Sequence, residues 1–202
     1  MKKAFILAIS IAILFAFTTA GCKQEAKGGD ATSEIKSEEE VSTENEEDAP
    51  PQASPRKQAS DNIGDLAISI DYGSPAVKGR VIWGELEGYG KVWRAGANET
   101  TSIEFSADVM VNGNPLPAGK YGFFLIPIEG EAWVAIFNEE WSQELHGSWG
   151  AFGYKQEKDV LRVDVTPEWV KESMERLEYT VNDSGFAFAW EKARINFEIT
   201  SK

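Results

Sequence analysis

The chain of 202 residues carries a formal net charge of −13 at pH 7, with 33 acidic against 20 basic side chains. This balance argues against a nucleic-acid partner, because binding to phosphates needs a high density of lysine and arginine. Cys22 is the only cysteine, which excludes an intramolecular disulfide and a zinc site built from several thiolates.

Residues 1–21 have the pattern of an export signal. Lys2 and Lys3 precede an apolar run over residues 4–17, and small residues lead up to Cys22. Removal of this segment would take away two lysines and leave a mature chain with a net charge of −15.

Thr19-Ala20-Gly21-Cys22 resembles a lipobox, although Thr19 stands where that motif prefers leucine. We therefore expect cleavage before Cys22 and lipidation of its thiol and amine. More than one acyl chain gives a stable anchor, so the lipid bilayer is an expected partner. The expected location is the cell envelope, at the outer membrane. The alternative is ordinary secretion with a free cysteine.

Residues 22–61 are predicted to form a disordered acidic tether. This stretch has no aromatic residue and contains Glu38-Glu39-Glu40 and Glu46-Glu47-Asp48. Such a composition buries too little apolar surface to offset the entropy of the chain. The predicted role is a spacer between the membrane and a folded domain.

Residues 62–202 are predicted to form one all-β domain, because apolar and polar side chains alternate with a period of two. About nine or ten short strands are expected, at 66–72, 77–83, 102–105, 109–111, 120–126, 132–137, 161–165, 177–181, 186–190 and 195–199. An antiparallel β-sandwich or jelly roll accommodates such a series. The only predicted helix is 167–176, with Thr166 as its cap and Pro167 in its first turn.

Two long segments, 84–99 and 138–159, abandon the alternation. Irregular segments of this length in a compact domain usually carry function or are disordered. Their aromatic residues, among them Trp93, Trp141 and Trp149, argue against disorder.

Several ordered motifs resemble a bacterial family known as domain of unknown function 2911. They include Tyr89–Glu99 (YGKVWRAGANE), Leu116–Tyr121 (LPAGKY), Trp149-Gly150 and Asp159–Val163 (DVLRV). The resemblance covers about residues 66–199 and implies a secreted or lipid-anchored β-sandwich-like domain of a Gram-negative bacterium. It implies no activity and no site residues. The segment Glu144–Ser148 is longer than the family's usual spacing.

No catalytic residue, cofactor or metal site is predicted. The single histidine, His146, is too little for a histidine-rich zinc site, and no G-x-S-x-G nucleophile motif occurs. A calcium site formed by oxygen ligands stays open, but no spaced acidic motif marks one. Acidic residues beside the two irregular segments leave a carboxylate-dependent hydrolase as an alternative, because glycoside hydrolysis uses a pair of carboxyls.

The segment from Trp93 to Asn98 is the leading candidate for ligand binding. Arg94 offers a planar set of donors, Asn98 offers a donor and an acceptor, and an indole face binds sugars or cations. We expect Arg94 and Asn98 to face a shared pocket near the Trp83 end of the 77–83 strand. In the alternative interpretation Trp93 belongs to the core, Arg94 pairs with an acid such as Glu104, and Asn98 holds the loop.

Trp141 and Trp149 are expected to be exposed and to join this ligand site, whereas Trp83, Trp133 and Trp190 lie in strand patterns. The leading hypothesis is a membrane-anchored module that binds a glycan, a peptide or an envelope protein. The alternatives are the hydrolase and a purely structural envelope protein.

Overall fold

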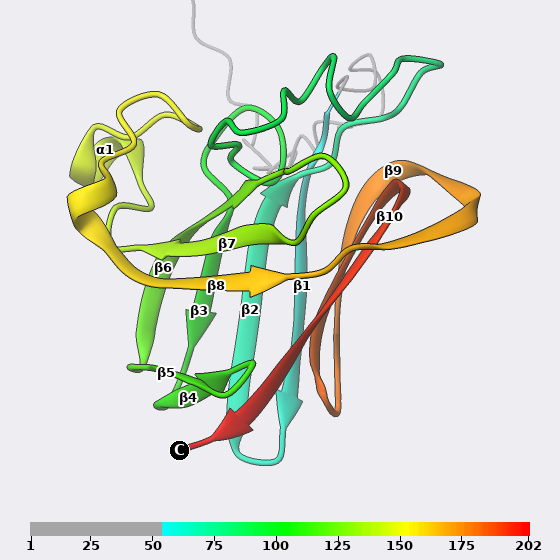
Figure 1. The fold of residues 1–202 in the computed structure, drawn as a ribbon. Coiled ribbons are helices and arrows are strands. Elements are labelled where there is room, and N and C mark those ends of the chain that lie inside the picture. The colour runs from blue at the N-terminus through cyan, green and yellow to red at the C-terminus, as the bar shows by residue number, and fades with distance from the viewer. Residues whose placement is uncertain (1–53) are drawn as a thin grey trace, which may run out of the picture. The chain divides into compact units, whose positions relative to one another are not determined.

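The computed structural model describes residues 54–202 and shows ten β-strands in two sheets (Figure 1). The predicted signal peptide, Cys22 and the tether up to residue 53 lie outside the described residues. Within residues 54–202, no helix has both the length and the apolar character needed to cross a membrane.

The larger sheet has six antiparallel strands in the order β1-β2-β3-β6-β7-β8. Their bounds are β1 Arg56–Ile63, β2 Leu66–Gly73, β3 Ser102–Phe105, β6 Gly119–Ile126, β7 Trp133–Asn138 and β8 Asp159–Val165. Chain-adjacent strands β1 and β2 are paired over eight positions, from Arg56 opposite Gly73 to Ile63 opposite Leu66.

The smaller sheet has four antiparallel strands in the order β5-β4-β10-β9. Their bounds are β4 Val109–Val111, β5 Asn114–Leu116, β9 Glu168–Asn182 and β10 Gly185–Ser201. The two longest strands, β9 and β10, form a hairpin (the orange and red arms in Figure 1). The expected all-β fold is thus confirmed as a sandwich-like pair of sheets.

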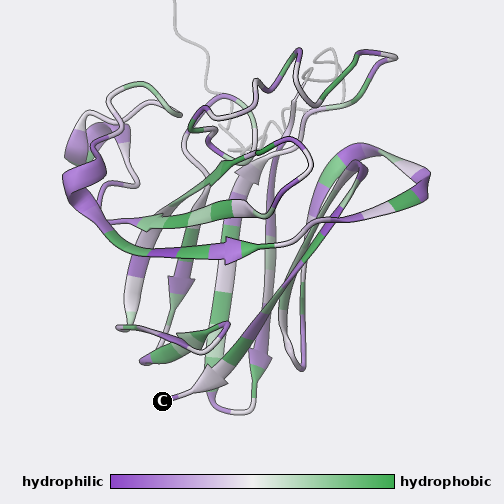
Figure 2. Ribbon diagram, viewed as in Figure 1, coloured by the Kyte–Doolittle hydropathy of each residue, from purple (hydrophilic) through white to green (hydrophobic). Residues whose placement is uncertain are grey.

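The core contains side chains from both sheets, as the alternation predicts. Along β2, residues 66, 68, 70 and 72 are buried and the side chains between them are more exposed, and Figure 2 shows green bands that alternate with paler ones. Phe123 of β6 packs against Phe137 of its own sheet and against Tyr179, Phe186 and Phe197 of the other sheet. Aromatic contacts therefore hold the two sheets together.

The predicted helix at 167–176 is wrong, because these residues form the first half of strand β9. Glu168 and Trp169 are paired with Arg194 and Ala193 of β10. The Trp169 ring also packs 6.1 Å from that of Trp133. Pairing with a neighbouring strand has overridden the local cap signal at Thr166 and Pro167, as tertiary context often does.

The predicted strand at 77–83 is also wrong. Val77 and Ile82 are both buried although a strand would place them on opposite faces, and Val81 is 56 % exposed although it would share the face of Val77. The backbone turns at Lys78 and Gly79, whose φ values are 49° and 67°. Both values lie in the left-handed region that an extended strand does not use. The segment instead contacts β9, where the Val77 N–H donates to the Glu175 carbonyl at 2.7 Å.

The predicted boundary between the tether and the domain at residues 61 and 62 is wrong, because it falls inside β1. Only Ala59 and Ile63 of this strand are partly buried against the core, and its other side chains are polar and exposed. A polar strand at the edge of a sheet avoids pairing with other molecules, but its composition is hard to distinguish from that of a tether.

We predict that β1 belongs to the folding unit. A chain that begins at Asn62 should melt at a temperature roughly 5–10 °C below one that begins at Ser54, because it loses six of the eight paired positions of β1 and the packing of Ala59. Thermal unfolding followed by circular dichroism measures the difference. Equal melting temperatures of the two chains would show that β1 does not contribute to the stability of the domain.

Candidate functional site

Trp93 anchors the segment 84–99 in the core. Its backbone N–H and carbonyl both pair with Leu125 of β6 at 2.8 Å, and its ring is stacked on Trp190 of β10 at 5.5 Å. The indole N–H donates to the Gly96 carbonyl at 3.1 Å, and only 3 % of the residue is exposed. Trp93 is therefore a core residue and does not face a ligand.

The backbone after Trp93 is pressed against the end of β2. A Cβ on Gly73 would lie 2.1 Å from the Ala97 carbonyl oxygen, so only glycine allows this approach. The Tyr179 hydroxyl donates to the Ala95 carbonyl at 2.7 Å from the opposite sheet. The loop that was predicted to bind a ligand thus acts mainly as a scaffold.

Arg94 contacts the second irregular segment instead of a pocket. A Cβ on Gly150 would lie 2.7 Å from the Arg94 Cδ, so the arginine side chain packs directly beneath this glycine. Thr100 adds a hydrogen bond from its hydroxyl to the Gly150 carbonyl at 3.1 Å. The expected pocket shared by Arg94 and Asn98 is wrong, and within residues 54–202 Arg94 forms no ion pair with Glu104 or any other carboxylate.

Glu87 is a partly buried carboxyl in the first segment. Burial raises its pKa from 4.5 to about 7, although the positive charges of Arg94 and Arg80 act in the opposite direction. Its backbone is fixed, since its N–H donates to the Ile82 carbonyl at 2.8 Å and its carbonyl accepts from Gly84 at 2.9 Å. The backbone of Glu87 is therefore held in place within the loop.

The segment 138–159 is held by an ion pair between buried Glu140 and exposed Lys155. Lys155 Nζ contacts both carboxylate oxygens of Glu140, at 2.8 and 3.1 Å, and Ser148 donates to the same carboxylate at 3.2 Å. The hydrogen bond from Lys155 holds the pKa of Glu140 below its usual value. Glu140 therefore joins Ser148 and Lys155, two residues far from each other within the segment, through one carboxylate.

A second set of polar contacts closes the base of this segment at Asp159. The Tyr154 hydroxyl donates to the Asp159 carboxylate at 2.6 Å, and the Asn138 side-chain amide donates to it at 2.7 Å. Arg162 forms an ion pair with it at 3.1 Å. The segment is thus tied to β7 and β8 at its two ends and is well fixed despite its irregular backbone.

His146 orients Trp141 through the short helix α1, Gln143–His146. The imidazole Nδ1 accepts from the backbone N–H groups of Trp141 and Ser142, each at 3.2 Å. Ser142 caps the helix by accepting from Leu145, and Gly147 ends it with a φ of 75°. Within residues 54–202, no three histidine, cysteine, aspartate or glutamate side chains gather closely enough to hold a metal ion.

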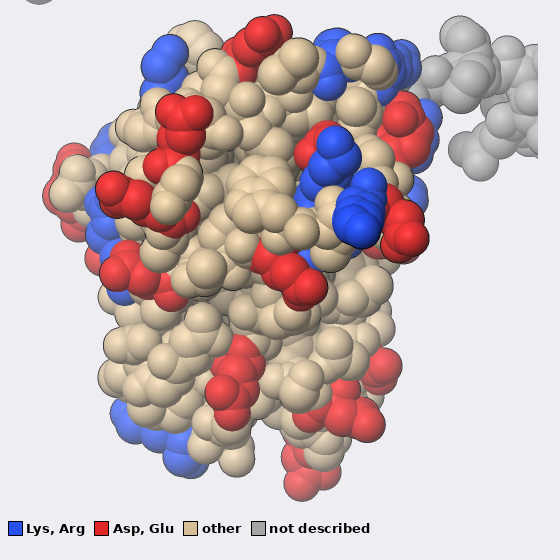
Figure 3. Space-filling view, turned by 45° about the vertical axis from the view of Figure 1, so that its right-hand side comes forward, with Lys and Arg blue, Asp and Glu red and all other residues tan. Residues whose placement is uncertain are grey.

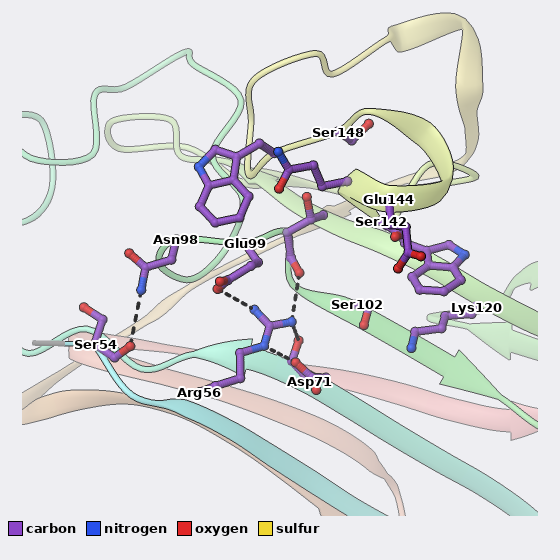
Figure 4. A pocket seen from close by; sticks show the side chains of 14 residues that line it. Ser54, Arg56, Asp71, Asn98, Glu99, Ser102, Lys120, Ser142, Glu144 and Ser148 are labelled. Carbon is purple, nitrogen blue, oxygen red and sulfur yellow. Dashed lines mark hydrogen bonds and ion pairs between the residues drawn. The ribbon is translucent and has the colours of Figure 1, made fainter. Parts of the chain in front are cut away.

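A pocket of about 630 Å³ opens where these segments meet β1, β2, β3 and β6 (Figure 4). Its volume lies within the range of small-ligand sites. It is lined by Ser54, Arg56, Asp71, Asn98, Glu99, Thr100, Ser102, Lys120, Trp141, Ser142, Gln143, Glu144, Ser148 and Trp149. Trp141 and Trp149 are the two indoles of this lining.

Arg56 forms the polar floor of the pocket. Its guanidinium is paired with the Asp71 carboxylate, approaches Glu99 at 3.6 Å and donates to the Thr100 carbonyl at 3.1 Å. Lys120 lies 4.3 Å from the ring centre of Trp141, a cation–π contact that restrains this indole. The pocket therefore combines a nearly charge-balanced floor with aromatic surfaces.

Three of the five residues predicted to bind a ligand line this pocket, namely Asn98, Trp141 and Trp149. Trp93 and Arg94 do not line it, and they position the loops around it. Three pocket residues were not predicted from the sequence: Arg56 was assigned to the tether, and Asp71 and Lys120 were only placed in the predicted strands 66–72 and 120–126. Their polar character did not mark them as pocket residues, because polar side chains are common on any exposed strand face.

A family model described as protein of unknown function (DUF2911) matches residues 54–199. The chain belongs to this family. No curated protein and no solved structure shows a significant match to the chain. The DUF2911 match begins two residues before β1, so the family's domain includes this strand together with all residues that line the pocket.

We predict that Glu87→Gln stabilises the DUF2911 domain at pH 8. Above pH 7 the folded domain must keep a charged carboxyl partly buried, and below pH 4.5 the carboxyl is protonated in both folded and unfolded chains. The stability of the wild-type domain should therefore decrease as the pH rises between these values. The substitution should raise the free energy of unfolding at pH 8 by roughly 1–3 kcal/mol and have little effect at pH 4.

Urea unfolding at the two pH values measures this difference. Glu85→Gln, which alters an exposed carboxyl of the same segment, serves as the control and should change stability little at either pH. Destabilisation by Glu87→Gln at pH 8 would show that the Glu87 charge supports the fold.

Proposed function

We propose that this chain is a membrane-anchored lipoprotein of the cell envelope whose DUF2911 domain binds a glycan in the pocket between Trp141 and Trp149. The observation that carries the proposal is the pair of indoles on a polar cavity (Figure 4). An indole face packs well against the C–H face of a sugar, while carboxylates, amides and hydroxyls can bind the sugar's hydroxyl groups.

The charges of the pocket favour a neutral ligand. Arg56 and Lys120 provide two positive charges, and Asp71, Glu99 and Glu144 provide three negative charges. Arg56 is already engaged with Asp71 and Glu99, and Lys120 lies over the indole of Trp141. No free cluster of one sign is therefore offered to a strongly charged peptide or to an acidic polymer.

The same contacts favour binding over hydrolysis. A glycoside hydrolase places two carboxyls on either side of the bond that it breaks. Asp71 and Glu99 instead both contact the Arg56 guanidinium on the floor of the pocket. This arrangement supports a recognition site, in which fixed polar groups orient a ligand without transferring protons.

The lipid anchor is proposed from the residues before Cys22, with the outer membrane as its location. Ser54, the first residue that the structure describes, lines the pocket, and the proposed anchor at Cys22 precedes it in the chain. This connection would keep the pocket close to ligands of the cell envelope.

We predict that Cys22→Ser releases the protein from washed membranes into the soluble fraction, because the acyl chains supply the anchoring free energy. Cell fractionation followed by immunoblotting tests this. The unaltered chain is the control and should stay with the membranes. Retention of the Cys22→Ser chain in the washed membranes would contradict the lipid anchor.

We predict that Trp149→Ala weakens glycan binding by at least about tenfold, because truncation of a central aromatic contact commonly costs more than 1 kcal/mol. The full chain in detergent is screened on an array of neutral glycans, and affinity for each bound glycan is then measured by calorimetry. Trp169→Ala is the matched control, since Trp169 is 52 % exposed and lies outside the pocket.

The control variant should bind as the unaltered chain does. Equal loss in both tryptophan variants would point to a general effect on the fold. An array without any bound glycan would contradict the proposed ligand and leave a peptide or an envelope protein as the partner.

A further inference from the structure

Beside the pocket, the tight turn Trp149-Gly150-Ala151-Phe152 carries two exposed aromatic side chains. Trp149 and Phe152 form an antiparallel bridge, with backbone hydrogen bonds of 3.1 and 2.8 Å in the two directions. Side chains of residues directly opposite in such a bridge point to the same face. The side chains of Phe152 and Trp149 therefore leave the turn on the same face.

The exposure of this turn is unusual for the domain. Phe152 is 83 % exposed and Trp149 is 41 % exposed, although large apolar side chains are mostly buried elsewhere in residues 54–202. Trp149 lines the pocket, whereas Phe152 lies outside its lining. An exposed apolar surface that continues from a binding pocket commonly marks a larger contact with the ligand.

The turn is also held firmly in place. Gly150 rests on Arg94 and accepts the hydrogen bond from Thr100, and Ser148 is bound to the Glu140–Lys155 ion pair. Aromatic side chains on a fixed backbone lose little conformational entropy when a ligand binds. Phe152 can therefore bind part of a ligand with little loss of conformational entropy.

We infer that the pocket takes a chain of neutral sugar units and that Phe152 forms an outer contact for the unit next to the one bound at Trp149. This inference rests on the proposed function and extends it to the length of the ligand. The pocket holds the inner units between Trp141 and Trp149, and the chain leaves past Phe152.

A lipid surface fits the same turn less well. A bilayer would have to cover the polar lining beside Trp149, including Glu144 and the Arg56 cluster, and exposed carboxylates are repelled by anionic headgroups. The sugar chain satisfies both parts of the surface at once, since it presents C–H faces to the rings and hydroxyl groups to the polar lining.

The test compares affinity with chain length. The full chain in detergent is titrated with cello-, malto- and N-acetylchito-oligosaccharides of increasing length, from two to six units. In the series that binds, affinity should rise with length and then level off. Phe152→Ala should lower affinity for the longer members by at least about fivefold and leave the disaccharide unaffected, whereas Trp149→Ala should weaken binding of all members.

Val160→Ala removes an exposed apolar side chain of β8 outside the pocket and serves as the control, with no expected change. Binding that is independent of length, or a Phe152→Ala effect equal for all lengths, would overturn the inference and leave the glycan pocket intact. Absence of binding in every series would instead count against the pocket's proposed ligand, and the inference would fall with it.

Binding to lipid vesicles tests whether the turn contacts a lipid surface instead of a sugar chain. If Phe152→Ala and Trp149→Ala weaken the association of a Cys22→Ser chain with phosphatidylcholine vesicles, and no oligosaccharide binds, the turn is a lipid contact and the inference is overturned. We expect the Cys22→Ser chain to show no association with these vesicles, with or without the aromatic substitutions.

Discussion

The packing of Trp93 between the two sheets is the interaction on which the candidate site depends. Its backbone forms two hydrogen bonds with Leu125 of β6, and its ring is stacked on Trp190 of β10. This fixes the next residue, Arg94, beneath Gly150, and thereby fixes the turn that carries Trp149. One buried indole in the first irregular segment thus sets the position of an exposed indole in the second.

The walls of the pocket come from different parts of the chain. The floor comes from the ends of β1 and β2, where Arg56 and Asp71 are paired, and the side of the pocket comes from Lys120 and the segment around α1. Domain residues 54–202 contain no cysteine, so packing and polar contacts alone must hold these walls together. The tryptophans that meet around Trp83 add aromatic contacts at centroid distances of 4.6 to 6.2 Å. Figure 3 shows a different face, where tan surface lies between groups of acidic and basic residues.

The sequence predicted those features that depend on local alternation. Strand β2, whose buried residues recur every second position, lies close to where it was expected, whereas the two strands predicted at 186–190 and 195–199 form one continuous strand, β10, with register shifts between them. Residues 167–176 and 77–83 were misjudged because strand pairing and two left-handed residues decided their structure, and neither leaves a clear periodic signal. The polar edge strand β1 was missed for the opposite reason, since its exposed face resembles a tether.

The candidate site was predicted only in part. Composition predicted Trp141 and Trp149 to be exposed aromatic residues in an irregular segment. Both line the pocket, but Trp149 is exposed and Trp141 is half-buried. Composition could not distinguish residues that line the pocket from residues that support the loop. Trp93 and Asn98 lie five positions apart in one loop, yet Trp93 is buried in the core and Asn98 lines the pocket. Only the three-dimensional path of the loop, pressed against Gly73, distinguishes them.

Nuclear magnetic resonance of the indole N–H groups tests the proposed glycan site, because the seven tryptophans of the chain include Trp141 and Trp149 in the pocket, buried tryptophans in the core, and Trp169 exposed outside the pocket. The full chain, labelled with ¹⁵N at tryptophan and assigned by single substitutions, is titrated with the hexasaccharides of glucose and N-acetylglucosamine. The account predicts that the Trp141 and Trp149 resonances shift together and saturate, while those of Trp93, Trp133 and Trp190 stay in place. Shifts confined to Trp169 and Trp83, or no shift at Trp141 and Trp149 with any of these sugars, would contradict it.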